Sequence, residues 1–228
     1  MSKKLKHLAI IMDGNRRWAK EKGLKSYEGH QAGRENVEKV VKWCKEANIK
    51  ILTLYAFSAE NWQRPKIEVD FLMQAFIEAF NDDVLRLHDE KIKVNVFGRV
   101  SKLSTKLQKS IKKATELTKN NKEGILNLCI NYSGRLEIVD AVNHIIANKK
   151  SKKAINEEDI KHHLYGKDMS DPDLIIRTSG EKRLSGFLLW QAAYSELLFI
   201  DKYWPDFSKK DFLKAVDCFY HRKRRFGC

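Results

Sequence analysis

The chain has 228 residues and a formal net charge of +14, with 44 Lys and Arg against 30 Asp and Glu. This length is sufficient for one domain with a sizeable core, and no apolar run approaches the roughly 18 residues that span a bilayer. We expect no signal peptide and a cytoplasmic protein, with peripheral attachment at the inner face of the membrane as an alternative. The charge predicts an anionic partner, but nucleic acid, a membrane surface and a phosphorylated substrate all fit it.

Apolar runs alternate with amphipathic segments along the chain. The predicted strands cover residues 8–12, 49–57, 92–97, 125–130, 173–176 and 197–200. The predicted helices cover residues 30–47, 67–88, 102–119, 135–147, 156–164 and 187–193, with a last helix that begins at Ser208 and ends in the basic run 222–225. Residues 20–28 and 149–153 are expected to be loops. This alternation predicts an α/β fold with one domain over residues 1–228 and a mostly parallel six-stranded sheet flanked by helices.

Four cysteines, Cys44, Cys129, Cys218 and Cys228, lack the paired spacing of a zinc or redox motif. The first three fall on apolar positions of predicted elements. We therefore expect buried free thiols rather than disulfides.

The first strand is followed by a carboxylate, a tight turn and a basic segment that begins a helical pattern. Asp13 comes directly after the strand, Gly14 and Asn15 form the turn, and Arg16 and Arg17 follow. Ligands of open α/β sheets bind at the carboxyl ends of strands. Asp13 could hold a divalent cation there, while turn amides and guanidinium groups hold phosphate oxygens. The alternative is an ordinary turn with solvated arginines.

Two further polar stretches, residues 58–64 and 177–185, follow the second and fifth strands. The exits of parallel strands share one edge of the sheet, so these stretches can meet Asp13. Together they supply one carboxylate, several arginines and short hydroxyl and amide groups, which suits a magnesium–diphosphate site. Polar loops also follow strands by chance. Neither common nucleotide-binding glycine motif is present, and Asp82-Asp83 lacks the third Asp of a DDxxD motif.

The predicted helix 67–88 carries an apolar stripe that includes Met73, Phe76 and Phe80. An ordinary core face is one interpretation. Because the helix follows the polar stretch 58–64, the stripe could instead line a hydrocarbon channel beside the phosphate site.

The sequence resembles the cis-prenyltransferases over nearly its whole length. The motifs that carry the resemblance are residues 7–19, Gly29-His30-x-x-Gly33, and residues 52–65, 173–181, 183–185, 187–191, 195–197, 204–207 and 224–227. The resemblance implies a homodimer with an apolar tunnel. It also implies Mg²⁺-dependent addition of isopentenyl diphosphate to farnesyl diphosphate, with Z double bonds. The implied product is undecaprenyl diphosphate, the precursor of a lipid carrier for cell-wall glycans, which is then handed to the membrane.

The resemblance also implies roles for individual residues. Asp13 would bind Mg²⁺ and assist departure of the allylic diphosphate, together with Glu196, which would act across the dimer interface. Asn61 lies at the position of the family's proposed proton acceptor, although an amide is a poor base and is better suited to positioning an oxygen or a water. The residues implied for the allylic substrate are Gly14, Asn15, Arg16, Arg17, Trp18, Ser26, His30, Ser58, Ala59, Glu60, Trp62 and Arg64. Those implied for isopentenyl diphosphate are Arg177, Arg183, Leu184 and Ser185.

Several of these residues could instead have a structural role or differ from the family pattern. His30 could be a structural histidine and Glu196 a salt-bridge partner. Family members usually carry Arg at the position of Ser26. Either Lys25 replaces that Arg or one phosphate contact is lost, and Arg16, where some relatives have Gly, could compensate.

Two other classes of function are disfavoured. A non-catalytic partner subunit is expected to lack motif residues, whereas this chain keeps Asp13, Asn61, Arg177, Arg183 and Glu196. No basic–aromatic motif for nucleic acid is present, so we expect no nucleic-acid partner. The basic run 222–225 is expected to be a solvated or dimer-edge cluster, or an attraction for anionic lipid.

Overall fold

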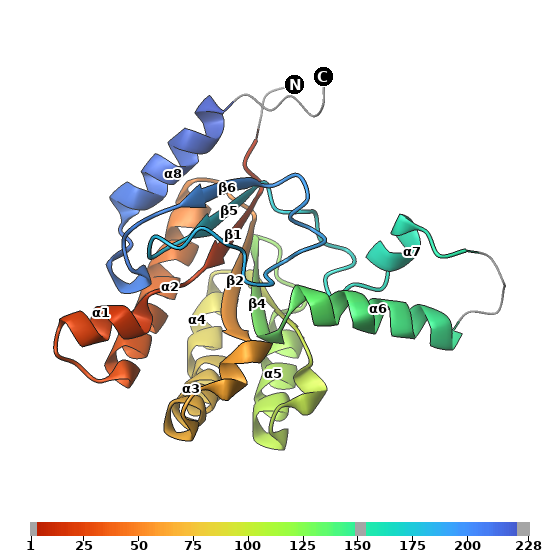
Figure 1. Ribbon diagram of the computed structural model, residues 1–228, viewed down its shortest axis with the longest axis horizontal. Helices are drawn as coiled ribbons and strands as arrows, with labels where there is room; N and C mark the ends of the chain where they lie inside the picture. Colours follow the sequence, from red (N-terminus) through yellow and green to blue (C-terminus); the bar gives the residue numbers. More distant parts are fainter. Residues whose placement is uncertain (1–3, 149–153, 223–228) are drawn as a thin grey trace.

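The computed structural model describes residues 4–148 and 154–222. Within these residues a six-stranded sheet has the order β3-β4-β2-β1-β5-β6, and every neighbouring pair is parallel (Figure 1). The strands are β1 (His7–Ile11), β2 (Ile51–Ser58), β3 (Ile92–Phe97), β4 (Gly124–Tyr132), β5 (Leu174–Arg177) and β6 (Glu196–Phe199). The prediction of a single α/β domain with a parallel six-stranded sheet is confirmed.

Helices connect the strands. They are α1 (Asn15–Glu21), α2 (Ser26–Glu46), α3 (Lys66–Glu78), α4 (Val84–Asp89), α5 (Thr105–Thr118), α6 (Gly134–Asn148), α7 (Glu157–Lys161) and α8 (Lys209–His221). Short 3-10 turns are η1 (Ala59–Gln63), η3 (Val100–Lys102) and η4 (Trp204–Asp206), and a π-helical turn, η2 (Ala79–Asp83), joins α3 to α4. The predicted helix 67–88 therefore forms, but with a π-helical turn inside it.

Two predicted helix boundaries differ from the structure. Helix α2 begins inside the expected loop 20–28, because the Glu28 carboxylate accepts a hydrogen bond from the Lys25 N–H at 2.8 Å and closes a capping box. Asn156 does cap α7, through the Asp159 N–H at 2.9 Å, but the helix ends at Lys161 and not at residue 164. The loop 149–153 and most of the basic run 222–225 lie outside the described residues.

The segment 187–193 was predicted to be a helix and is a series of turns. Ser185, Gly186 and Leu188 have positive φ, which breaks a helical path. Phe187 is fully buried and stacks on Tyr55 with ring centroids 4.7 Å apart. The apolar residues of segment 187–193 therefore cover one face of the sheet. A helix covering that face would need a similar apolar pattern, which explains the incorrect prediction.

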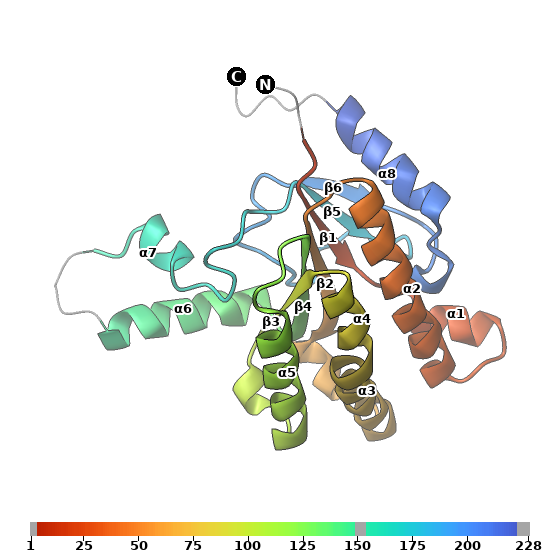
Figure 2. The ribbon, with the colours of Figure 1, turned by 180° about the vertical axis from the view of Figure 1, so that it is seen from behind.

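The two faces of the sheet are covered differently. Leu8, Ile10 and Ile176 face α2 and α8, and α3 and α5 extend this layer over β3 and β4. Figure 2 shows α2, α4 and α5 side by side on this face. Ala9 and Ile175 face the opposite way, against the turns around Phe187 and Leu188.

Two expectations about the whole chain can be compared with the described residues. Cys44 and Cys129 are buried free thiols, as predicted, and Cys218 is half-buried and free. Burial raises the pKa of the Cys44 thiol. In residues 4–148 and 154–222, none of the helices has the length and apolar character needed to cross a membrane.

Candidate functional site

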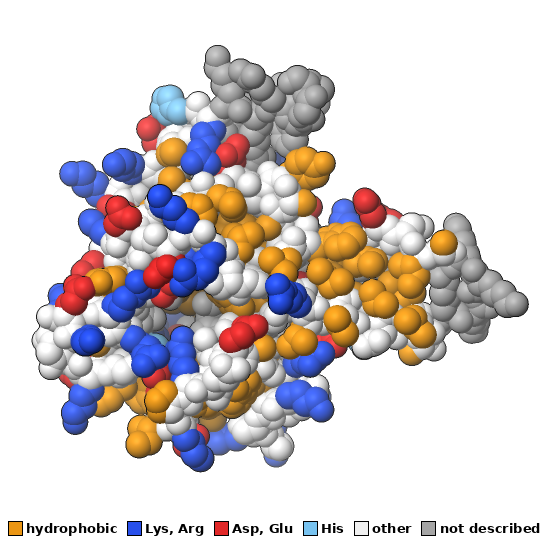
Figure 3. Space-filling model, viewed as in Figure 1, with side chains coloured by type: hydrophobic (Ala, Val, Ile, Leu, Met, Phe, Trp, Pro, Cys, Tyr) orange, Lys and Arg blue, Asp and Glu red, His pale blue; other side chains and the backbone are white. Residues whose placement is uncertain are grey.

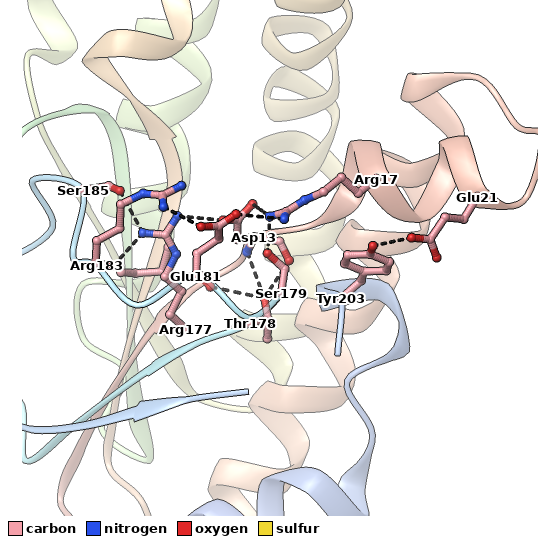
Figure 4. Close-up of polar contacts among 11 residues, drawn as sticks. Asp13, Arg17, Glu21, Arg177, Thr178, Ser179, Glu181, Arg183, Ser185 and Tyr203 are labelled. Carbon is pink, nitrogen blue, oxygen red and sulfur yellow. Dashed lines mark hydrogen bonds and ion pairs between the residues drawn. The ribbon is translucent and has the colours of Figure 1, made fainter. Parts of the chain in front are cut away.

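Asp13 lies where β1 ends, at the carboxyl edge of the sheet. Its backbone is fixed by Thr178, whose hydroxyl accepts the Asp13 N–H at 2.9 Å and donates to the Asp13 carbonyl at 2.7 Å. Its carboxylate pairs with Arg177 at 2.7 Å and with Arg17 at 3.3 Å (Figure 4). Two segments that are far apart in the sequence, residues 13–17 and 177–178, thus meet at one carboxylate.

Arg177 ends β5 and has a side chain only 6% exposed. Its guanidinium donates to the Ser185 hydroxyl at 2.8 Å and to the Arg183 carbonyl at 2.5 Å, in addition to Asp13. Burial would raise the pKa of the Asp13 carboxyl, but the hydrogen bond and charge of Arg177 and the charge of Arg17 hold it below its ordinary value. Asp13 is therefore an ionised carboxylate at neutral pH, as a cation ligand must be.

A ring of polar contacts surrounds this pair. Arg17 donates to Ser179 and pairs with Glu181 at 3.0 Å, and Glu181 also pairs with Arg183. The Arg17 guanidinium lies over the Tyr203 ring, 5.7 Å from its centroid. Figure 4 shows these side chains in one row along the sheet edge. The two arginines nearest Asp13 are thus held by carboxylates and hydroxyls that anionic oxygens could replace.

A second cluster forms around Glu68, in the first turn of α3. Its carboxylate accepts from Arg64 at 3.1 Å, contacts His30 at 3.1 Å and pairs with Arg16 at 3.5 Å. The Glu68 side chain is only 9% exposed. Burial lowers the pKa of His30 despite the opposing pull of Glu68, so the ring is neutral at pH 7.

Glu68 was not among the residues selected from the sequence. The available signal was its spacing, since Arg64 and Glu68 are four residues apart and can pair along one turn of the chain. An acidic residue in a first helical turn is common, however, because it stabilises the helix. Only the folded chain shows that three predicted phosphate ligands converge on it.

The start of α2 brings His30 to this place by close packing. A Cβ atom on Gly29 would lie 2.1 Å from the Asn15 carbonyl oxygen, and one on Gly33 would lie 2.6 Å from the Asn15 Oδ1. Helices α1 and α2 can approach this closely only with glycine at both positions. The Gly29-His30-x-x-Gly33 motif therefore sets the position of His30.

The turn η1 carries Asn61 and Trp62. The Asn61 Oδ1 accepts the Ser58 N–H at 3.1 Å, so its amide oxygen is engaged by the backbone. The Trp62 indole donates to the Asn131 Oδ1 at 2.8 Å, and its ring packs edge-on against Phe57. Trp18 is turned away toward Asp206, to which its indole donates at 2.8 Å.

A polar cleft of about 850 Å³ opens at the sheet edge. The predicted residues that line it are Asp13, Gly14, Asn15, Arg16, Arg17, Ser26, His30, Ser58, Asn61, Arg64, Arg177 and Ser185. The predicted residues that lie outside its lining are Trp18, Ala59, Glu60, Trp62, Arg183, Leu184 and Glu196.

An apolar cavity of about 220 Å³ adjoins the cleft. Met12, Asn15, His30, Ala56 and Leu72 line both spaces. The remaining wall of the cavity comes mainly from apolar residues of α2, α3, η2, α4 and the sheet. A charged group bound in the cleft could therefore extend an apolar tail into the cavity.

Comparison with known proteins identifies the architecture. The family model “Putative undecaprenyl diphosphate synthase” matches residues 11–227. The chain belongs to the cis-prenyltransferase family. An isoprenyl transferase of Thermotoga maritima is 49% identical, covering 97% of this chain and 96% of that protein. A tritrans,polycis-undecaprenyl-diphosphate synthase (geranylgeranyl-diphosphate specific) of Thermoplasma volcanium is 49% identical, covering 97% and 88%.

A solved structure agrees with this assignment. Lavandulyl diphosphate synthase from Lavandula x intermedia, in complex with dimethylallyl diphosphate, superposes with a TM-score of 0.93 at 37% identity, covering 98% of each chain. The chain is therefore an enzyme that transfers prenyl groups and makes a prenyl diphosphate.

Ser26, where members of this family usually carry Arg, lies at the start of α2 and lines the cleft. Its Oγ is buried and has no hydrogen-bond partner within residues 4–148 and 154–222. Arg16 reaches Glu68 in the same cluster as Arg64. Arg16 and Ser26 line the same cleft, so this cleft has a cation from α1 although the usual Arg is missing from α2.

Glu196 is the one predicted metal ligand that the fold separates from Asp13. It begins β6 opposite Leu174, whereas Arg177, the partner of Asp13, lies opposite Phe199 at the other end of the strand. Glu196 pairs with Arg222 at 2.8 Å. Among the described residues no group of three or more His, Cys, Asp or Glu could hold a metal, and of the two predicted metal ligands only Asp13 lines the cleft.

Proposed function

We propose that this enzyme elongates an allylic diphosphate, best represented by farnesyl diphosphate, with isopentenyl diphosphate to give a long Z-polyprenyl diphosphate. The observation that carries the proposal is the junction between the arginine-lined cleft and the apolar cavity. A diphosphate needs several cations to leave water, and a growing hydrocarbon chain needs an apolar space next to it. The catalytic domain comprises the whole chain, residues 1–228.

The allylic diphosphate is held by the α1 turn and its surroundings. Gly14 and Asn15 offer backbone amides at the start of α1, and Arg16, Arg17 and Arg64 supply positive charge. The remaining residues of this subsite are Trp18, Ser26, His30, Ser58, Ala59, Glu60 and Trp62. The tail enters the apolar cavity, which we propose is the start of the family's tunnel.

Isopentenyl diphosphate binds on the β5 side of the cleft. Arg177 already donates to Ser185 and to the Arg183 backbone, so these groups form a prearranged anion site, with Leu184 between them. Asp13 lies between the two diphosphate subsites, within 2.7 Å of Arg177. The allylic C–O bond would break while the isopentenyl double bond forms the new C–C bond. A proton is then lost.

The side chains around Asp13 in the cleft are suited to holding one Mg²⁺ ion. Mg²⁺ uses one or two carboxylates and completes its shell with phosphate and water, and Asp13 is an ionised, partly exposed carboxylate. When bound, the ion would neutralise charge on the departing diphosphate. Asn61 is best suited to positioning an oxygen that receives the proton, since its amide oxygen already accepts a backbone N–H.

A homodimer completes the proposal. Glu196 could join Asp13 at a metal only in the site of a second subunit, because the strand register separates the two residues within one chain. Exposed apolar side chains over α6 and α7 offer a surface for such contact (Figure 3). They include Val139 and Ile146 on α6 and Ile155 just before α7. The enzyme would work in the cytoplasm, with transient attachment at the membrane that receives undecaprenyl diphosphate for cell-wall glycan synthesis.

The test is incorporation of labelled isopentenyl diphosphate by purified protein. Incubations contain farnesyl diphosphate and Mg²⁺, and matched incubations contain EDTA or lack the allylic substrate. We expect incorporation only in the complete mixture. Absence of incorporation by folded, dimeric protein would favour a non-catalytic partner subunit.

A further inference from the structure

Helix α2 and the α3–η2–α4 segment are joined by a row of ion pairs, here called the ionic seam. Arg34 on α2 contacts Asp83 at 2.8 and 3.0 Å and Glu78 at 3.3 Å. Glu38 contacts Arg86 at 2.6 Å. Lys45 contacts Glu90 at 3.4 Å. Figure 2 shows the two helical segments side by side on one face of the sheet.

The ionic seam lies directly over the apolar cavity. Five seam residues, Arg34, Glu38, Asp83, Arg86 and Glu90, also line the cavity. Between them the same two helical segments present apolar side chains inward. These are Val37, Val41, Ala79, Phe80, Val84 and Leu87. The lining contributed by the two walls therefore combines apolar side chains with the charged seam residues that join the walls.

The π-helical turn η2 explains how one short segment serves both purposes. It buries Phe80, which is 3% exposed, in the core beside the cavity. Three residues later it directs the Asp83 carboxylate to Arg34, and both side chains are mostly buried at 17% and 25% exposed. π-Helical turns often occur at functional sites. The Arg34–Asp83 contact is bidentate, the strongest geometry for such a pair.

The apolar cavity is too small to enclose a long product. A protein cavity of about 150 Å³ holds one benzene molecule, so about 220 Å³ holds one or two five-carbon units. A longer chain can be enclosed between the two walls only if the cavity enlarges. The sheet is continuous hydrogen-bonded structure, whereas the wall between α2 and α4 is joined by ion pairs that can separate.

We propose that the ionic seam determines product length, because its separation is what allows the cavity to grow with the chain. This inference rests on the proposed elongation function. Each added isoprene unit pushes α2 and the α3–η2–α4 segment further apart against the attraction of the ion pairs. Elongation stops when the next unit would need a wider separation of these segments than the ion pairs permit. The seam residues are specificity determinants and do not touch the reacting atoms.

The first test is the Asp83→Asn variant, which removes a seam charge and keeps the shape of the side chain. The matched control is Asp70→Asn, which removes an exposed ion pair with Lys66 on the same helical segment and does not line the cavity. Products are separated by chain length. For Asp83→Asn we expect the ratio of products beyond the wild-type stop to products at that stop to rise about fivefold, which corresponds to about 1 kcal/mol. The control keeps the wild-type distribution.

The second test is a charge swap at the Lys45–Glu90 pair, which also serves if Asp83→Asn fails to fold. Glu90→Lys places two like charges across the seam and is expected to lengthen the products. Adding Lys45→Glu restores opposite charges and is expected to restore the wild-type distribution. A merely structural role would change total incorporation or thermal stability and leave the distribution unchanged.

The outcomes separate this inference from the proposed function. If wild-type protein makes a ladder and the seam variants stop at the same length, the seam proposal is wrong and the elongation function stands. If wild-type protein incorporates no isopentenyl diphosphate, the proposed function fails and the seam proposal fails with it. Longer products in the single variants, with restoration in the swap, would support both.

Discussion

Replacing Asp13 with Asn should weaken folding as well as activity. From the resemblance alone, loss of this carboxylate would remove turnover and leave the fold nearly intact. The structure shows that Asp13 is the counter-charge of the nearly buried Arg177, at 2.7 Å. Removing one partner of a buried pair typically costs 3–5 kcal/mol, because the remaining charge stays buried.

The expected magnitude is lower than that range for two structural reasons. Asp13 is 28% exposed, so water already screens part of the pair. Arg177 also keeps its hydrogen bonds to the Ser185 hydroxyl and the Arg183 carbonyl. We therefore expect a loss of about 2 kcal/mol in the free energy of unfolding, which lowers Tm by roughly 4–8 °C for a chain of this size.

A double-mutant cycle isolates the pair. Urea unfolding of wild type, Asp13→Asn, Arg177→Met and the double variant is followed by circular dichroism at pH 7 without Mg²⁺. We expect the double variant to be more stable than the sum of the single losses predicts, by more than about 1 kcal/mol. A coupling energy below about 0.5 kcal/mol would refute the reasoning, and would mean that Arg177 is solvated without Asp13.

Three further predictions follow from other contacts. Glu68→Gln should lower the Tm by a few degrees, because Arg16, His30 and Arg64 lose the carboxylate that they share. Inorganic pyrophosphate should raise the Tm of this variant more than the Tm of wild type, and a thermal shift assay measures both effects. Burial lowers the pKa of His7 to about 4. Because the unfolded chain binds the proton at a higher pH than the folded chain does, the contribution of neutral His7 to stability is full above pH 6.5 and is lost as the pH falls toward 4. Urea unfolding at a series of pH values should show a loss of about 3 kcal/mol between those limits, and His7→Gln should remove most of that slope. Gly14→Ala should destabilise the fold by about 2 kcal/mol, because Gly14 has φ of 105° and a Cβ atom there would lie 2.6 Å from the Tyr203 ring; equal stability in chemical unfolding would show that the turn relaxes freely.

The fold could be predicted well because its strands carry unambiguous signals. Residues 8–12 are an unbroken apolar run that stops at a carboxylate and a glycine, which is typical of a parallel strand buried on both faces. The structure places β1 at His7–Ile11, in the middle of the sheet. The parallel order then brings the exits of β1, β2 and β5 together, so the meeting of Asp13 with Arg177 followed from topology alone.

Other features depend on tertiary structure. The apolar residues 187–193 could cover a core either as a helix or as turns, and the positive φ at Leu188 is set by packing. Glu68 has the sequence context of an ordinary helix start, and its three partners become visible only when α1, α2 and η1 meet. Glu196 belongs to a matching motif, but strand register puts it at the far end of β6 from the cleft, which no sequence spacing reveals.

The measurement that tests the central proposal most directly is the size of the product. Purified protein is incubated with farnesyl diphosphate, excess labelled isopentenyl diphosphate and Mg²⁺, and the dephosphorylated products are separated by chain length. We predict a ladder of successive additions that ends near eleven isoprene units. A single condensation product, with no longer species at any time, would contradict the proposal that the cleft and the apolar cavity together form the site of repeated chain elongation.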